Sequence, residues 1–158
     1  FKFTNMKTLF VSILFISSVL FPTKLAVTPI ASDILGTYWN EEKDAKIRIY
    51  LAQNGKYAGK IEWMKEPNDA SGKPKLDNLN PNSKLRSNPR LGLAIMKNFE
   101  FNAGNKRWED GTIYDPKNGK TYDGYMYFDG KQTDKLSLRG YVLGMSMLGR
   151  TSTWERVK

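Results

Sequence analysis

Residues 108–128, WEDGTIYDPKNGKTYDGYMYF, set the pattern for the rest of the chain. Two runs rich in aromatic and β-branched residues flank the turn sequence Asp115-Pro116-Lys117-Asn118-Gly119. Pro116 pre-sets the backbone of a turn, and Asn118-Gly119 supplies the positive φ angles that a chain reversal needs. The stretch therefore predicts a β-hairpin. Because a two-stranded ribbon alone is marginal in water, other segments must add strands to it.

Alternating apolar and polar residues predict these further strands. Residues 45–51 place Ala45, Ile47, Ile49 and Leu51 on one face, which is typical of a strand that is wet on its other face. The turn sequence Gln53-Asn54-Gly55 then leads into a second hairpin. The pattern predicts about eight strands and no long amphipathic helix. The expected strands outside the first hairpin are 34–40, 45–51, 56–64, 91–101, 135–141 and 150–157.

Strands joined by short turns favour an all-β fold, an antiparallel up-and-down barrel of about eight strands, because closure removes exposed sheet edges. A two-sheet sandwich is the alternative. Glycines inside strands, at Gly59, Gly124 and Gly140, favour the barrel because they mark bends or close backbone approach. Residues 65–89 are polar and contain four prolines, and we expect a long loop there, near the barrel opening. A tolerated insertion is the alternative for this loop.

The first 31 residues differ in kind from the rest. Lys2 and Lys7 precede an apolar run, 8–21, that is short for a membrane span, which is the pattern of a secretory signal peptide. An uncleaved anchor is the competing interpretation. Residues 32–158 then form a single domain, exported to the periplasm or the exterior, with no membrane span after cleavage. The candidate start is Met6, and the candidate cleavage points are Ala26, Ala31 and Ser32.

The chain has no cysteine and no histidine. Without cysteine it has no disulfide and is not expected to be a lipoprotein. The commonest metal ligands, histidine-dependent hydrolysis and thiol chemistry are all missing, so we expect no metal, no cofactor and no catalytic residue. The formal charge of +9 falls to +6 without the signal region, which holds three lysines and no acid. That excess favours anionic envelope surfaces, whereas export argues against nucleic acid as a partner.

Several ordered motifs resemble the bacterial family called domain of unknown function 2147. They include Gly36-Thr37-Tyr38-Trp39, 111–116, Leu138-Arg139-Gly140-Tyr141 and Gly149-Arg150-Thr151. The resemblance implies an exported, lipocalin-like or calycin-like small barrel with no established activity. Through a looser similarity to lipocalins, it also implies that Gly36 and Trp39 pack near Arg150 or Arg156. The residues with expected structural roles are Gly36, Asp115, Pro116, Gly119, Gly140 and Arg150.

The expected function is binding of one small apolar or amphiphilic molecule inside the barrel. The four tryptophans fall on four different strands and are expected to cluster in or at the mouth of the barrel, with plain core packing as the alternative. Methionines suit a variable apolar ligand, and an inward arginine would suit a carboxylate. The candidate ligand contacts are Trp39, Trp63, Trp108, Trp154, Tyr122, Arg139, Met145 and Met147.

Two other functions stay open at this point. One is a carboxylate-dependent enzyme acting on an envelope glycan, which would need two carboxylates facing each other. The other is an envelope surface-interaction protein with a filled core. A cavity of a few hundred cubic ångströms, lined by Trp and Met residues, would favour the binding protein, and a filled interior would favour the surface-interaction protein. The carboxylates in question are Glu62, Asp69, Asp115 and Asp123, with Lys97, Arg139 or Tyr122 as partners.

Overall fold

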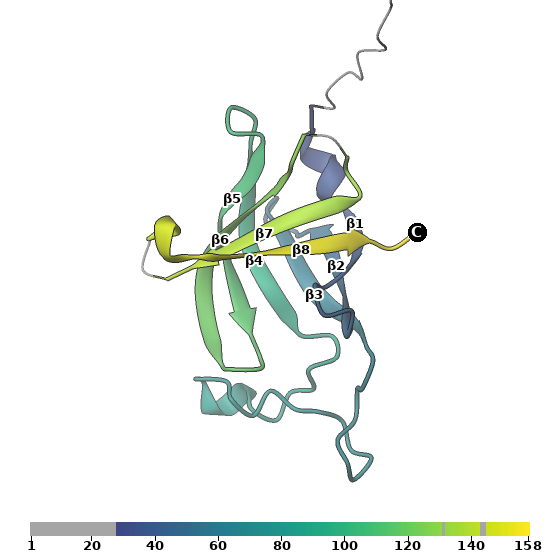
Figure 1. Ribbon diagram of the computed structural model, residues 1–158. Coiled ribbons are helices and arrows are strands. Elements are labelled where there is room, and N and C mark those ends of the chain that lie inside the picture. Colours follow the sequence, from purple (N-terminus) through teal and green to yellow (C-terminus); the bar gives the residue numbers. More distant parts are fainter. Residues whose placement is uncertain (1–27, 131, 143–144) are drawn as a thin grey trace, which may run out of the picture.

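A computed structural model of the chain describes residues 28–130, 132–142 and 145–158. Eight antiparallel strands follow one another in space, and the last returns to pair with the first, so the sheet closes into a barrel (Figure 1). This confirms the up-and-down barrel and rules out the sandwich. The strands are β1 (Gly36–Trp39), β2 (Ala45–Leu51), β3 (Tyr57–Met64), β4 (Ala94–Asn102), β5 (Arg107–Asp115), β6 (Lys120–Phe128), β7 (Lys135–Tyr141) and β8 (Arg150–Arg156).

Three short 3-10 helices accompany the strands: η1 (Ala31–Ile34), η2 (Ser83–Leu85) and η3 (Ser146–Leu148). In the described part of the chain, no helix combines the length and hydropathy that a membrane crossing requires. Most of the expected signal peptide lies outside the described residues. Its last residue, Ala31, begins η1, so among the expected cleavage points only Ala26 precedes this helix.

The β5–β6 hairpin forms as the sequence predicts. Asp115 and Lys120 are the last paired residues before the turn. The Asp115 carboxylate accepts a hydrogen bond from the Lys117 backbone N–H at 2.8 Å, and the Asp115 carbonyl accepts one from the Gly119 N–H at 2.8 Å. Gly119 has φ 72°, and a Cβ there would collide with the Leu79 carbonyl. Asp115 and Gly119 therefore shape the turn directly.

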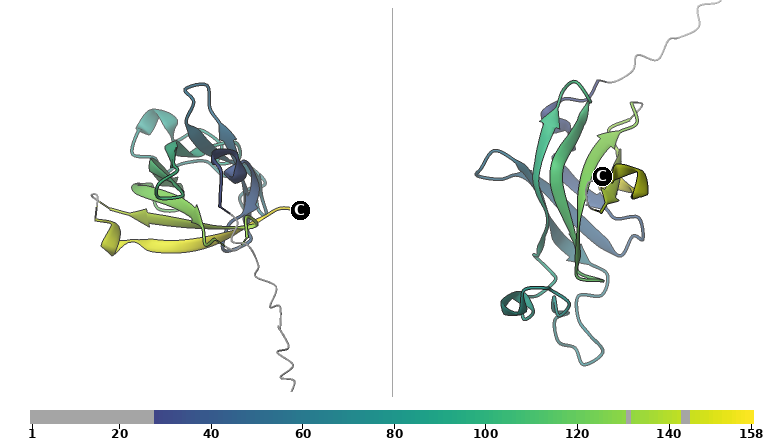
Figure 2. Two further views of the ribbon diagram at one scale, coloured as in Figure 1. Left: turned by 90° about the horizontal axis from the view of Figure 1, so that it is seen from above. Right: turned by 90° about the vertical axis from the view of Figure 1, so that its left-hand side faces the viewer.

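One end of the barrel is filled by aromatic side chains. Trp108 is completely buried, and its ring lies 4.9 Å from that of Phe101 and 5.5 Å from that of Phe128, measured between centroids. The helix η1 covers this end, because the Trp108 indole N–H donates to the Ala31 carbonyl at 3.1 Å and Ile34 is fully buried. Figure 2 shows η1 at the end opposite the long β3–β4 connection. We refer to the η1 end as the closed end.

Towards the other end the inward-facing side chains become smaller. Along β2 they run from Ile49 through Ile47 to Ala45, and along β7 they run from Leu136 to Gly140. Less side-chain volume is therefore available to fill the barrel there. The size gradient leaves this end hollow.

The seam between β1 and β8 is short, with two residue pairs, Tyr38–Arg156 and Trp39–Glu155. Arg156 reinforces it. Its guanidinium donates to the carbonyls of Leu35 at 2.7 Å and Thr133 at 3.1 Å, and also to that of Asp33. It lies over the ring of Tyr38, 4.7 Å from the centroid. Gly36 makes room for it, because a Cβ there would collide with the guanidinium.

This arrangement corrects the expected pairing of Trp39 with Arg150 or Arg156. Tyr38 faces inward and lies beneath Arg156, whereas Trp39, one residue later, faces the other way, because successive side chains of a strand alternate. Arg150 lies at the opposite end of β8 and pairs with Glu41 at 2.7 Å. Of the two arginines, Arg156 is therefore the one that reinforces the seam.

Arg156→Ala is expected to lower the free energy of unfolding by about 2–3 kcal/mol, because three backbone carbonyls lose a charged donor. Arg150→Ala on the same strand is the control and should cost less than about 1 kcal/mol, since its ion pair is exposed. Urea unfolding measures both. Equal losses would show that Arg156 has no special place at the seam.

Some glycines inside strands let large side chains of neighbouring strands pack directly against the backbone. A Cβ on Gly111 would collide with ring atoms of Phe99, and one on Gly124 would meet Ile113 Cδ1 at 2.5 Å and the Arg139 carbonyl at 2.9 Å. Gly140 differs, because its nearest neighbours would be 3.7 Å away or more. Close packing therefore requires glycine at the first two positions but not at the third.

Gly111→Ala should destabilise the barrel by about 1–3 kcal/mol, because the added methyl group overpacks against Phe99. Gly140→Ala should be neutral or stabilise by up to about 1 kcal/mol, because glycine inside a strand costs conformational entropy. Thermal or urea unfolding of the two variants checks the opposite signs. The same loss in both would contradict the packing described for Gly111.

Candidate functional site

A cavity of about 770 Å³ occupies the hollow end of the barrel. It opens between the β1–β2, β3–β4, β5–β6 and β7–β8 connections, which together form its rim. The deeper wall carries no charged side chain among the described residues. That wall is lined by Ala45, Ile47, Ile61, Ile95, Ile113, Leu138 and Trp154, with Ser152 and Gly140 nearer the rim.

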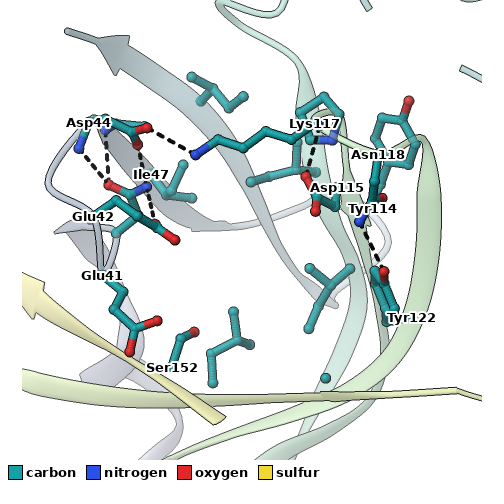
Figure 3. A pocket seen from close by; sticks show the side chains of 18 of the residues that line it. Glu41, Glu42, Asp44, Ile47, Tyr114, Asp115, Lys117, Asn118, Tyr122 and Ser152 are labelled. Atoms are coloured by element: carbon teal, nitrogen blue, oxygen red, sulfur yellow. Dashed lines mark hydrogen bonds and ion pairs between the residues drawn. The ribbon is translucent and has the colours of Figure 1, made fainter. Parts of the chain in front are cut away.

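Two ion pairs bridge the rim. Lys117, from the β5–β6 turn, extends across it to Asp44 of the β1–β2 connection, with Nζ 2.9 Å from Oδ2 (Figure 3). Arg150, at the start of β8, reaches Glu41 of the same connection at 2.7 Å. Asn40 holds Asp44 in place by donating to its carboxylate at 2.6 Å. The Lys117–Asp44 pair thus ties the rim together across strands that are not neighbours, and the Arg150–Glu41 pair joins β8 to the connection that follows its neighbour β1.

The Lys117–Asp44 pair is ionised at neutral pH. Burial acts to raise the pKa of Asp44, but hydrogen bonds from Asn40 and Lys117 outweigh it and hold the pKa below its ordinary value. The hydrogen bond to Asp44 raises the pKa of Lys117, against the opposite effect of burial. Both groups keep their charge over the whole neutral range, so the rim stays polar above an apolar wall.

The long β3–β4 connection, 65–93, is built onto the rim around one buried carboxylate. Asp77 is 0% exposed and accepts hydrogen bonds from the Tyr114 hydroxyl at 2.6 Å and the Asn80 side-chain amide at 2.6 Å. Its own N–H donates to the Asn88 carbonyl at 2.9 Å. These contacts join both halves of the connection to β5. The loop is therefore a structured part of the rim rather than a loosely attached insertion.

Two of the eight candidate ligand contacts, Trp154 and Tyr122, line the cavity. The Tyr122 hydroxyl lies at the rim and accepts a hydrogen bond from the Asn118 side chain at 3.0 Å (Figure 3). Trp108 lies in the closed end, away from the cavity lining.

The expected cluster of four tryptophans does not form. Trp39 and Trp63 pack against each other on the outer face of the barrel, with ring centroids 5.3 Å apart. Lys46, paired with both in the sheet, places its Nζ 4.6 Å and 5.4 Å from their centroids. Strand alternation explains the separation, because the positions of Trp39 and Trp63 face outward while that of Trp154 faces inward.

The remaining candidates lie outside the cavity. Arg139 donates to the Thr151 hydroxyl at 3.1 Å and to the Met147 carbonyl at 3.5 Å. Met145 is 45% exposed and Met147 is 90% exposed. Neither the aliphatic wall nor the Lys117–Asp44 bridge was predicted from the sequence. The shrinking inward positions of β2 and β7 were a usable signal for the wall.

The carboxylates considered for an enzyme do not face one another across the cavity. Glu62 accepts a hydrogen bond from Thr37 at 2.8 Å outside the cavity lining, and Asp69 accepts hydrogen bonds from its own turn. Asp123 is exposed on β6, and Asp115 shapes the hairpin turn at the rim. Within the described residues, no group of three acidic side chains is placed to hold a metal ion.

Residues 36–156 match the family described as "Uncharacterized protein conserved in bacteria (DUF2147)". The chain belongs to this family. It is also similar to a solved structure entitled "Protein HP1028 from the human pathogen Helicobacter pylori belongs to the lipocalin family", with a TM-score of 0.63 and 24% identity. The match covers 79% of this chain and 83% of that one, and at this identity it concerns the fold, a lipocalin-like barrel. No curated protein sequence matches the chain.

Tyr114→Phe in this DUF2147 barrel should loosen the 65–93 connection, because Asp77 stays buried with one donor fewer. We expect a loss of about 1–3 kcal/mol in the free energy of unfolding and faster amide hydrogen exchange in 65–93. Tyr122→Phe is the control, since its hydroxyl bonds an exposed side chain, and it should change little.

The same contact sets a pH dependence. Burial, together with the hydrogen bond to Asp77 and its charge, raises the pKa of Tyr114 from 10.0 to about 12. Since the folded-state pKa is raised, the stability contributed by Tyr114 is complete below pH 10 and is lost as the pH rises from 10 towards 12. Ultraviolet titration should show one late-ionising tyrosine fewer in Tyr114→Phe. An unchanged titration would contradict the Asp77 contact.

Proposed function

We propose that this protein is an exported, non-enzymatic binding protein whose barrel holds one small molecule with an apolar body and a polar end. The observation that carries the proposal is the cavity of about 770 Å³, which lies within the range of about 300–1,000 Å³ typical of small-molecule sites. Its contrast between an apolar wall and an ionised rim matches an amphiphile, with the apolar part deep and the polar end at the rim.

The energetics favour a ligand with an aliphatic or aromatic body. Each buried methylene contributes about 0.8 kcal/mol, so a chain of about eight carbons would supply about 6 kcal/mol before the costs of association. Conversely, an ion placed against the wall of Ile47, Leu138 and Trp154 would lose its hydration without a partner. A charged group on the ligand therefore belongs at the rim, where Lys117 and Arg150 supply cations and Asp44 and Glu41 supply anions.

The other two functions lack such support. A surface-interaction protein with a filled core gives no reason for a cavity at one end of the barrel. A carboxylate-dependent enzyme needs a facing pair of carboxylates, and Glu62, Asp69, Asp115 and Asp123 have the separate placements described above. The lipocalin-like fold and membership of an uncharacterised family are consistent with a binding role. Export to the periplasm or the exterior, inferred from the first 31 residues, belongs to the same proposal.

Native mass spectrometry of the protein purified from its own envelope, without detergent, tests the proposal. We expect a co-purified amphiphile of one chemical class. Trp154 lines the cavity, so a bound ligand should also change tryptophan fluorescence. No co-purified molecule, together with no fluorescence change across a panel of lipids and metabolites, would contradict the proposal.

Ser152→Phe is expected to block the cavity. Ser152 lines it, whereas the adjacent Thr153 is exposed on the other face of β8, so Thr153→Phe is a matched control. Displacement of anilinonaphthalene sulfonate by the co-purified ligand should weaken by about tenfold or more in Ser152→Phe, because the added ring occupies the site. Thr153→Phe should bind as the wild type does. Equal losses in the two variants would place the ligand elsewhere.

A further inference from the structure

We propose that the protein docks on the surface of a bilayer with anionic headgroups, rim first, through an apolar tip made of Val142, Met145, Met147 and Leu148. The inference rests on the proposed function, because docking would present the cavity to the membrane in which an amphiphilic ligand resides. The tip belongs to the β7–β8 connection and includes part of η3.

The tip exposes four apolar side chains that lie close together in the sequence, rather than a single one. Met147 is 90% exposed, Leu148 68%, Met145 45% and Val142 40%. Contiguous apolar exposure of this kind marks interaction sites on soluble proteins. Met145 and Met147, expected to be ligand contacts inside the barrel, instead project from it.

The apolar surface of the tip is continuous with that of the cavity. Val142 and Leu148 line the cavity opening and are exposed at the same time. An alkyl chain passing from a bilayer into the barrel would therefore stay against apolar side chains. Continuity of this kind is what transfer of an amphiphile requires, because exposure of the chain to water costs free energy.

Hydrogen bonds hold the tip in its projecting position. The Met145 N–H donates to the Val142 carbonyl at 3.0 Å, and the Leu148 N–H donates to the Met145 carbonyl at 3.0 Å. The Arg139 guanidinium donates to the Met147 carbonyl at 3.5 Å. The backbone of the tip is thus tied to β7, so the tip does not need to fold before it inserts.

The charges around the rim complement an anionic surface. Arg139 and Arg150 bracket the tip, and the 65–93 connection carries six basic and three acidic residues. The rim acids Glu41 and Asp44 are each matched by a cation in an ion pair, whereas Glu42 and Asp115 also line the rim without one among the described residues, so the basic excess comes from the 65–93 connection. Basic residues near an apolar anchor are the usual requirement for stable attachment to anionic lipid.

Co-sedimentation with vesicles tests the proposal on the exported chain. We expect binding to vesicles of equimolar phosphatidylcholine and phosphatidylglycerol, and weaker binding to phosphatidylcholine alone or at high salt. The double variant Met145→Gln/Met147→Gln should lower the partition coefficient by about tenfold or more, because two apolar side chains no longer enter the bilayer. Leu51→Gln is the matched control, since Leu51 is 54% exposed at the end of β2 nearer the closed end.

Three results would overturn the docking proposal: no binding of the wild type to the mixed vesicles, equal binding of the double variant, or an equal loss in Leu51→Gln. A dimer in sedimentation velocity that the double variant abolishes would also overturn the docking proposal, because the tip would then bind a second copy of the chain.

Ligand displacement in vesicle-free buffer separates the docking proposal from the proposed binding function. The double variant should retain ligand displacement. If the wild type binds vesicles but shows no ligand displacement, the cavity is not a binding site and the docking proposal still stands.

Discussion

A row of antiparallel strands becomes a barrel only when the first strand pairs with the last, and here that pairing spans two residue pairs. Arg156 reinforces this pairing through hydrogen bonds to the carbonyls of Asp33, Leu35 and Thr133, and the Val157 N–H adds a bond to the Thr37 carbonyl. One side chain therefore joins the seam, the η1 helix and the β6–β7 connection. The guanidinium fits because Gly36 has no side chain and because Tyr38 provides an aromatic face beneath it. The Arg156 guanidinium thus contributes both to closing the barrel and to holding η1 over the closed end.

The two ends of the barrel differ because of side-chain volume. Trp108 and its aromatic neighbours fill the closed end, whereas Ala45, Ser152 and Gly140 occupy inward or lining positions near the rim. The filled end supplies the buried apolar area that stabilises a chain without disulfides. The hollow end is then free to be shaped by loops. Lys117 and Asp44 brace those loops across the opening, and Asp77 fixes the longest of them.

Local patterns in the sequence were enough to predict the strands, the two hairpins and closure of the barrel. The turn at Asp115–Gly119 is an example, because its geometry depends on residues within five positions of one another. Strand alternation shows that only one of the two neighbouring aromatics on β1 can face inward, whereas residue type alone does not show which one. Trp39 was the residue expected near the arginine, yet its neighbour Tyr38 is the one that faces inward beneath Arg156.

The candidate site was less accessible from sequence because its parts are distant along the chain. Asp44 and Lys117 are separated by 73 positions and meet only when the barrel has closed. Asp77 and Tyr114 are likewise brought together by the fold. The projection of Met147 could not be read from composition, since an apolar connection is equally compatible with facing the cavity or the solvent. Trp154 and Tyr122 line the cavity, and their contact with a ligand stays a prediction.

A crystal structure of the protein purified from its own envelope, without detergent, tests the central claim most directly. The account predicts a closed barrel with continuous, elongated electron density between Ile47, Leu138 and Trp154 that ends near Lys117 at the rim. A barrel whose rim side chains have folded inward to fill that volume would contradict it.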